Sequence, residues 1–150
     1  MPLIRLIQHG SQAYREMVQL RDELLRKPLG LHFTPEYLQR EATDILIGCF
    51  DAPAGEKEGR LIGCCILSPL DTQLMQLRQM AVAASHQGSG IGSSLLTFAE
   101  STAAAQGFRI LMMHARKTAA PFYEHLGYRI AGDEFTEVGI PHFEMRKIIG

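Results

Sequence analysis

The sequence predicts an α/β fold in which helices flank a mixed sheet, with residues 1–150 forming one domain. Three observations support this prediction. The composition, 46% hydrophobic and 21% charged over 150 residues, is that of an ordinary globular domain. Short apolar runs of strand length are interspersed with segments of helical periodicity. Glycine and proline mark most of the boundaries between them, and the chain contains no repeat or low-complexity stretch.

The first half of the chain predicts three strands and two helices. Pro28 and Gly30 are expected to end the first helix, and Thr34 followed by Pro35 is typical of a helix N-cap and first helical position. A polar, turn-rich loop between two apolar runs predicts an antiparallel hairpin. The expected strands are residues 3–7, 45–50 and 61–67, the expected helices are residues 12–27 and 34–40, and the hairpin loop is residues 51–59.

The second half predicts four strands and two helices. Leu74, Met80 and Val82 are expected to share one face of the first of these strands. The longer helix has a strong apolar stripe and is expected to end at Gly107, which suits the residue after a helix. The strands are expected at residues 72–82, 108–114, 128–130 and 143–149, and the helices at residues 90–106 and 119–126.

Charge and cysteine content exclude several classes of protein. The formal net charge is −1 and the 15 basic residues are scattered, so we expect no nucleic-acid binding. The three cysteines, Cys49, Cys64 and Cys65, lack the spacing of a disulfide framework or a zinc site, and no metal is expected. There is no signal-peptide pattern at the N-terminus and no apolar run near the roughly 20 residues that span a bilayer. A cytoplasmic protein without a membrane partner is therefore expected.

The most informative segment is a glycine-rich turn, residues 87–93, that leads from a strand directly into a helix. It consists of Gln87, Gly88, Ser89, Gly90, Ile91, Gly92 and Ser93. Glycine lets the backbone approach a ligand closely and present free N–H groups. The positive end of the helix dipole begins at the same place, which favours an anion such as a diphosphate. A plain tight connection is the alternative interpretation.

Two familiar phosphate-binding patterns do not fit this turn. The P-loop requires a lysine after its last glycine, and this sequence has none there. The dinucleotide fingerprint requires a different glycine spacing in the first strand–helix–strand unit, and an acidic residue about 20 positions further on. A nucleotide-binding protein is therefore a weak alternative.

Two motifs resemble the GNAT family of acyl-CoA-dependent N-acetyltransferases. The segment Gln-Gly-Ser-Gly-Ile-Gly, residues 87–92, matches the family's pyrophosphate pattern [QR]-x-x-G-x-[GA]. Residues 119–128, Ala-Ala-Pro-Phe-Tyr-Glu-His-Leu-Gly-Tyr, match its second segment A-x-x-F-Y-x-x-x-G-[FY]. The C-terminal segment 135–145 resembles the ElaA-like and YjcF-like bacterial branches.

The resemblance implies a mostly antiparallel mixed sheet that splays open between its fourth and fifth strands and holds acetyl-CoA as cosubstrate. Backbone groups of Met80, Ala81 and Val82 would pair with the pantetheine. The residues of segment 87–93 would hold the pyrophosphate, and Ala119 and Phe122 would also contact the cofactor. Tyr123 would protonate the leaving thiolate, although a role as a core aromatic residue is the alternative.

The resemblance does not supply the general base, because the family positions that carry it in other branches match Gln76 and Arg78 here. His114, at the end of a predicted strand, is the chosen candidate, since an imidazole exchanges protons near neutral pH. A water chain without an essential base is an equal alternative. The other candidate side chains are His142, Glu134, Glu137 and Glu144.

The predicted function is therefore transfer of an acetyl group from acetyl-CoA to a primary amine, by direct attack in a ternary complex. A small-molecule amine is the expected acceptor, and a homodimer is expected from the family. The cysteines lie outside both motifs, which argues against an acyl-cysteine intermediate. The alternatives are a non-catalytic acyl-CoA sensor, a nucleotide-binding protein and a structural subunit.

Overall fold

The computed structural model describes residues 2–51 and 59–150, and these divide into two compact units. The first unit comprises Met1–Leu67 and Gln79–Ala99, and the second comprises Ser68–Arg78 and Glu100–Gly150. Strand β4 (Leu74–Val82) and helix α3 (Ile91–Ala105) each contribute to both units. The expectation of one domain over residues 1–150 remains a prediction.

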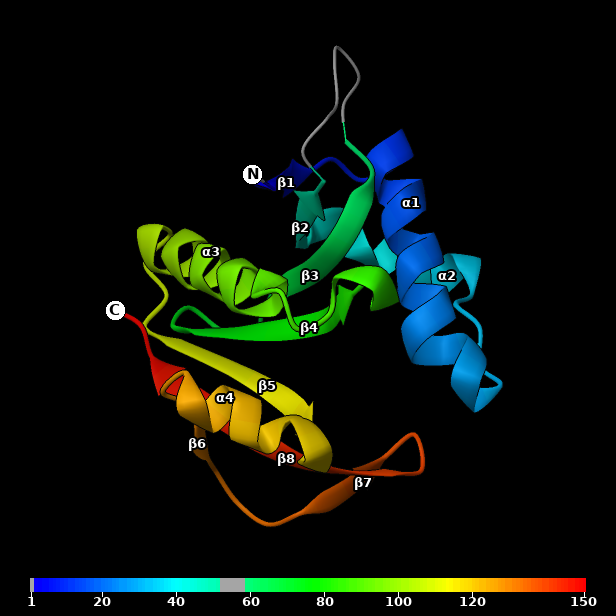
Figure 1. Ribbon diagram of the computed structural model, residues 1–150. Helices are drawn as coiled ribbons and strands as arrows, with labels where there is room; N and C mark the ends of the chain where they lie inside the picture. The colour runs from blue at the N-terminus through cyan, green and yellow to red at the C-terminus, as the bar shows by residue number, and fades with distance from the viewer. Residues whose placement is uncertain (1, 52–58) are drawn as a thin grey trace. The chain divides into compact units, whose positions relative to one another are not determined.

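The first unit contains a meander of antiparallel strands (Figure 1). Strands β1 (Leu3–Ile7), β2 (Ile45–Phe50) and β3 (Leu61–Pro69) pair in that order, and the end of β4 follows β3. The predicted hairpin is confirmed by the pairing of Ile45 with Leu67 through Cys49 with Gly63. Most of its predicted loop, residues 52–58, lies outside the described residues.

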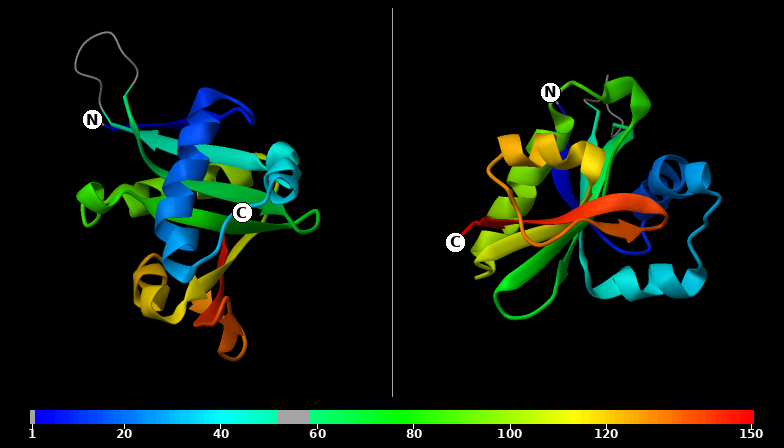
Figure 2. Two further views of the ribbon diagram at one scale, coloured as in Figure 1. Left: turned by 90° about the vertical axis from the view of Figure 1, so that its right-hand side faces the viewer. Right: turned by 90° about the horizontal axis from the view of Figure 1, so that it is seen from below.

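Helix α1 (Gln12–Arg21) lies across these strands, as the left view of Figure 2 shows. It continues through a π turn (Asp22–Arg26) and a 3-10 turn (Lys27–Leu29) to Gly30, so the predicted helix is confirmed, with a changed geometry in its last turns. Helix α2 (Pro35–Arg40) begins as predicted, because the Thr34 hydroxyl accepts the amide proton of Tyr37 at 3.2 Å.

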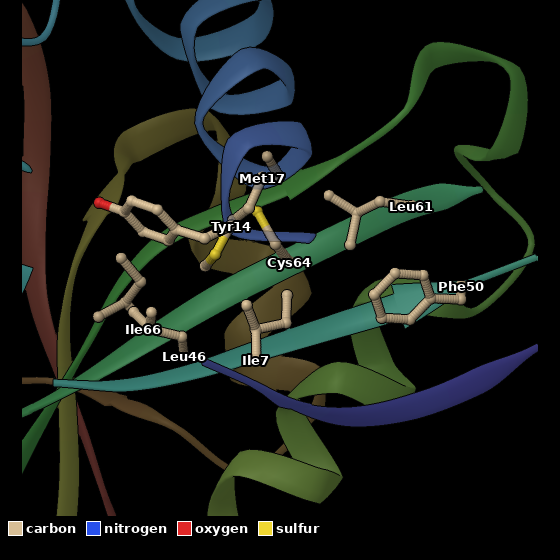
Figure 3. Packing of buried hydrophobic residues seen from close by; sticks show 9 residues of the cluster. Ile7, Tyr14, Met17, Leu46, Phe50, Leu61, Cys64 and Ile66 are labelled. Carbon is tan, nitrogen blue, oxygen red and sulfur yellow. The ribbon is translucent and has the colours of Figure 1, made fainter. Parts of the chain in front are cut away.

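The core of the first unit lies between α1 and the strands (Figure 3). Met17 and Tyr14 of α1 pack on the face of β3 that carries Cys64 and Ile66. Since neighbouring strand residues point to opposite faces, Gly63 lies on the other face, where it meets the beginning of α3. The two faces of β3 thus receive different helices.

The second unit is built on β8 (Ile140–Ile148), which is antiparallel to three strands. These are β5 (Ile110–Arg116), β6 (Arg129–Ile130) and β7 (Phe135–Glu137). The first part of β4 runs parallel to β5, with Leu74 opposite Ile110 and Leu77 opposite Met113. This parallel pair within mostly antiparallel neighbours confirms the predicted mixed α/β fold.

Several details of the second unit differ from the sequence prediction. Strand β5 begins two residues later than expected, because α3 ends in a Schellman turn in which Phe108 donates to the carbonyl of Ala103 at 3.1 Å. Helix α4 (Ala120–His125) is shorter than expected. Strand β7 was not predicted, since its few residues carry no alternating pattern and acquire strand geometry only by pairing with β8.

Candidate functional site

The glycine-rich turn is fixed to the sheet of the first unit at its beginning. The amide of Ala83 donates to the carbonyl of Ile62 on β3 at 2.8 Å. The Gln87 side chain turns back and donates through Nε2 to the carbonyl of Val82 at 3.0 Å. A 3-10 turn (Ala84–His86) lies between these two anchors. Gln87 therefore shapes the turn through its side chain, and residues 87–90 are exposed.

Two of the glycines in the turn have a backbone conformation that requires glycine. Gly88 and Gly90 have φ of 82° and 87°, in the left-handed region, whereas Gly92 is an ordinary helical residue. A β-carbon at Gly88 or Gly90 would meet no heavy atom within 4 Å, so the space beside both glycines is open. The left-handed backbone explains why both positions are glycine, and the open space leaves this side of the turn accessible to a ligand.

The turn ends at the N-terminus of α3, where backbone amides lack acceptors within the helix. Ile91, Gly92 and Ser93 form the first turn, and the amide of Ser94 is the one that donates to the Gly90 carbonyl, at 3.0 Å. The hydroxyl of Ser89 donates to the carbonyl of His86, and the backbone amide of Ser89 takes no part in this hydrogen bond. The exposed amides and the positive end of a fifteen-residue helix suit a diphosphate.

The beginning of α3 packs closely on β3 because β3 carries a glycine there. A β-carbon on Gly63 would lie 3.0 Å from Cγ2 of Ile91 and 3.1 Å from Cδ1 of Leu95. Ile91 is thus a buried anchor of the helix, 6% exposed, and its side chain faces the core. The side chain of Ile91, one of the predicted ligand-binding residues, is therefore not available to a ligand.

The end of β4 adds a residue that the sequence did not indicate. Leu74, Met80 and Val82 are all partly exposed, whereas Ala81 is buried, and the expectation that the three share one face stays a prediction. The preceding residue, Gln79, has a φ of 56°, which glutamine rarely adopts. Non-glycine residues in this region occur often at functional sites. No side-chain pattern could have predicted it.

Gln79 is held in this conformation by contacts from two sides. Its Nε2 donates to the hydroxyl of Tyr37 on α2 at 3.1 Å. The Cys64 thiol donates to its main-chain carbonyl, with a distance of 3.7 Å from sulfur to oxygen. The strained residue therefore lies directly before Met80–Val82, the backbone that the sequence predicted to pair with the pantetheine.

The second predicted motif lies in the second unit, around α4. Tyr123 is 8% exposed and its ring is packed edge-on against Phe122 and Tyr128, with ring centroids 5.0 and 5.9 Å away. Phe122 is exposed, and Ala119 precedes the helix in a 3-10 turn. Burial of the Tyr123 ring is compatible with both of its interpretations, so its catalytic role remains a prediction.

His114 lies on β5 with its side chain 34% exposed. Its Nδ1 is 3.0 Å from Oε1 of Glu137 on β7. His142, a candidate base from the sequence, is buried, and its Nδ1 donates to the Ile140 carbonyl at 2.7 Å. The structure therefore brings together three of the sequence candidates and leaves His114 the accessible imidazole among them.

The remaining candidates have other partners. Glu134 forms an ion pair with Lys117, with 2.7 Å between Oε1 and Nζ. Glu144 forms one with Arg146, with 2.6 Å between Oε2 and Nε. All three cysteines are free and buried, and burial raises the pKa of each thiol, to about 12 for Cys64. Raised thiol pKa values disfavour the thiolate that an acyl-cysteine step requires.

Within residues 2–51 and 59–150, no helix combines the length and apolarity needed to cross a bilayer. In the same segments, no three histidine, cysteine or acidic side chains gather in a way that would hold a metal ion.

The mixed sheet and the glycine turn before α3 define an α/β fold of the acyltransferase class. The family model described as the acetyltransferase (GNAT) domain matches residues 32–149. The chain belongs to this family. The N-acetyltransferase YjcF of Bacillus subtilis, described as uncharacterized, is 36% identical over 145 residues, which are 95% of this chain and 97% of YjcF.

Solved structures show the same fold at lower identity. An aminoglycoside 6'-N-acetyltransferase complexed with coenzyme A has a TM-score of 0.80 at 16% identity, covering 98% of this chain and 97% of that protein. ElaA of Escherichia coli has a TM-score of 0.77 at 17% identity, covering 98% and 99%. The predicted resemblance to the ElaA-like and YjcF-like branches is confirmed.

Proposed function

We propose that this protein is an N-acetyltransferase that moves the acetyl group of acetyl-CoA to a primary amine of a small molecule. The observation that carries the proposal is the turn at residues 87–93, where two left-handed glycines leave open space beside amides at the start of α3. Membership of the GNAT family supports it. So does the aminoglycoside acetyltransferase, a protein of the same fold that was solved with coenzyme A.

In this proposal the glycine turn and the end of β4 bind the cosubstrate. The backbone amides of residues 88–93 hold the pyrophosphate, and Gln87 keeps the turn in shape through its bond to Val82. Extended backbone at Met80, Ala81 and Val82 pairs with the pantetheine as a neighbouring strand would. The left-handed φ of Gln79 turns the backbone directly before them, and in this proposal a backbone amide at that turn donates to the thioester carbonyl.

His114 and Tyr123 are the groups that move protons. The amine nitrogen attacks the thioester carbon, so a C–N bond forms and the C–S bond breaks. His114 takes the proton lost by the nitrogen at Nε2, and Tyr123 gives its hydroxyl proton to the thiolate. Solvent then removes the proton from His114 and returns one to Tyr123. Ala119 and Phe122 contact the cosubstrate next to Tyr123, and most of the acceleration comes from positioning the two substrates.

The test is thermal unfolding of the purified protein with acetyl-CoA, coenzyme A, NAD or ATP. A ligand at about 100 times its dissociation constant stabilises the folded state by about 2.7 kcal/mol, a shift of several degrees. We expect acetyl-CoA and coenzyme A to shift the midpoint. A shift with NAD or ATP alone, or with none of the four, contradicts the proposal.

Gly90→Asp is the variant that locates the site, and Gly107→Asp is its matched control. Both glycines have left-handed φ, 87° and 91°, and a β-carbon at either meets nothing within 4 Å. The two substitutions therefore introduce the same backbone strain and the same charge. Gly107 lies beyond the other end of α3, so only Gly90→Asp should abolish the shift caused by acetyl-CoA. If both variants lose the midpoint shift with acetyl-CoA equally, the turn is not the binding site.

A further inference from the structure

The carboxylate of Glu137 faces two imidazole rings through its two oxygens. Oε1 lies 3.0 Å from Nδ1 of His114, and Oε2 lies 3.6 Å from Nε2 of His142. The three residues come from three neighbouring strands of the second unit, β5, β7 and β8. They are brought together by the β7–β8 hairpin, in which Glu137 is paired with Ile140.

The short contact determines which nitrogen of His114 carries the proton in the neutral ring. An ionised carboxylate only accepts hydrogen bonds, so the bond at 3.0 Å requires a proton on Nδ1. Neutral imidazole then has its lone pair on Nε2. This is the arrangement in which a carboxylate orients a histidine base and leaves its other nitrogen free.

The surrounding residues hold both partners in place. The Phe135 ring is edge-on to His114, with centroids 5.1 Å apart, and stacked on His142 at 5.9 Å. The Nδ1–H of His142 is already donated to Ile140, and only 4% of this residue is exposed. His142 is thus buried and held in one orientation, whereas the ring of His114 is partly exposed to solvent.

Glu144 is the other carboxylate near His114, because it is the residue opposite His114 on β8. Its Oε2 accepts a hydrogen bond from Nε of Arg146 at 2.6 Å, an ion pair on its own strand. Among the described residues, the two imidazoles are the basic groups that contact Glu137, and it forms no ion pair with an arginine or lysine there. The orienting contact therefore comes from Glu137.

We infer that Glu137 is a positioning residue that keeps the proton of neutral His114 on Nδ1, so that Nε2 presents its lone pair to the acceptor amine. The inference deepens the proposed function and rests on it for the identity of the base. It adds the residue that decides which nitrogen acts. The tautomer itself is a property of the protein without any substrate, and it can be measured directly.

The experiment is long-range ¹H–¹⁵N correlation NMR of the whole protein with ¹⁵N-labelled histidine, at a pH where the His114 ring is neutral. His114→Gln assigns the His114 signals by their disappearance. In the unmodified protein we expect the pattern of a ring protonated at Nδ1. In Glu137→Ala we expect a substantial population protonated at Nε2, because the acceptor that selects the tautomer is gone.

Glu134→Ala is the matched control. Glu134 and Glu137 side chains are similarly exposed, 44% and 45%, and lie in the same segment, but Glu134 pairs with Lys117. This variant should leave the His114 signals unchanged. The inference is overturned if the unmodified protein shows Nε2–H at His114, or if Glu137→Ala leaves the tautomer as it was.

The two experiments separate this inference from the proposed function. If the proposed function is wrong, acetyl-CoA will not shift the unfolding midpoint, but the NMR result for the His114 tautomer will be unaffected. Where transfer to an amine is detected, Glu137→Ala should lower kcat by about 10-fold or more, with the KM for acetyl-CoA unchanged. An unchanged kcat together with a changed tautomer would overturn the positioning role in the reaction.

Discussion

The guanidinium of Arg21 donates two hydrogen bonds to the carboxylate of Glu41, at 2.8 and 2.7 Å, where the two side chains are 0% and 1% exposed. The hydroxyl of Tyr14 donates to the same carboxylate at 2.7 Å, and burial and this bond raise the pKa of Tyr14. The Phe33 ring covers the guanidinium at 4.5 Å. The pair joins the end of α1 to the end of α2.

Glu41→Ala should therefore destabilise the protein strongly, because it leaves the charge of Arg21 buried without a partner. We expect a loss of about 3–5 kcal/mol in the free energy of unfolding, measured by urea titration. The double variant Arg21→Met/Glu41→Leu removes both charges and should recover most of this loss. A double variant as unstable as Glu41→Ala would show that packing, rather than the uncompensated charge, causes the effect.

The turn between β7 and β8 contains a β-branched residue in a conformation that disfavours it. Val138 has a φ of 45° and is followed by Gly139 at 76°, the geometry of a two-residue hairpin turn that favours Asn-Gly. Val138→Asn should raise the free energy of unfolding by about 1 kcal/mol. Ile130→Asn, at an exposed strand residue without positive φ, controls for removal of surface apolar area and should give no gain.

The buried thiols should make the folded state sensitive to alkali. Burial raises the pKa of Cys64 to about 12 and that of Cys65 well above its usual range. The unfolded chain releases these protons at a lower pH, so their stabilising effect is complete below about pH 8.5 and is lost as pH rises toward 12. Each thiol lowers the free energy of unfolding by at most about 1.4 kcal/mol per pH unit in that range.

The check is urea unfolding at pH values from about 7.5 to 9, where free thiols ionise and most free tyrosine, with a pKa of about 10, is still protonated. Cys64→Ala/Cys65→Ala should show a shallower decline with pH, even if it is less stable throughout. Thiol labelling should be slow in the folded protein and fast in urea. Equal slopes in both proteins would contradict the shifted thiol pKa values.

Tyr123→Phe tests the proposed proton donor. We expect kcat for transfer to a primary amine to fall by about 100-fold or more, while the midpoint shift with acetyl-CoA stays the same. Tyr128→Phe is the control, since it also removes a hydroxyl from a buried tyrosine in the same unit. The Tyr128 hydroxyl donates to Glu100 at 2.7 Å, away from any proposed role. Equal kcat values for Tyr123→Phe and the unmodified protein would assign Tyr123 to the core.

Several elements were predictable because local chemistry specifies them. Thr34 before Pro35 marks a helix start in the sequence, and the structure shows the hydroxyl–amide bond that explains it. The glycine turn was also visible, since Gly88 and Gly90 are the residue type that left-handed backbone requires. Strand β7 was not predicted, because only its pairing with β8 gives its few residues strand geometry.

The sequence alone determined the mixed α/β class, the family resemblance and the glycine turn before the long helix, because periodicity, capping and glycine placement act between residues close in the chain. Only the tertiary structure revealed the left-handed Gln79, held by Tyr37 of α2 and Cys64 of β3. It also selected Glu137 from several candidate carboxylates as the partner of His114. Both depend on contacts between segments far apart in the sequence, and no local pattern records which side chains folding brings within hydrogen-bonding distance.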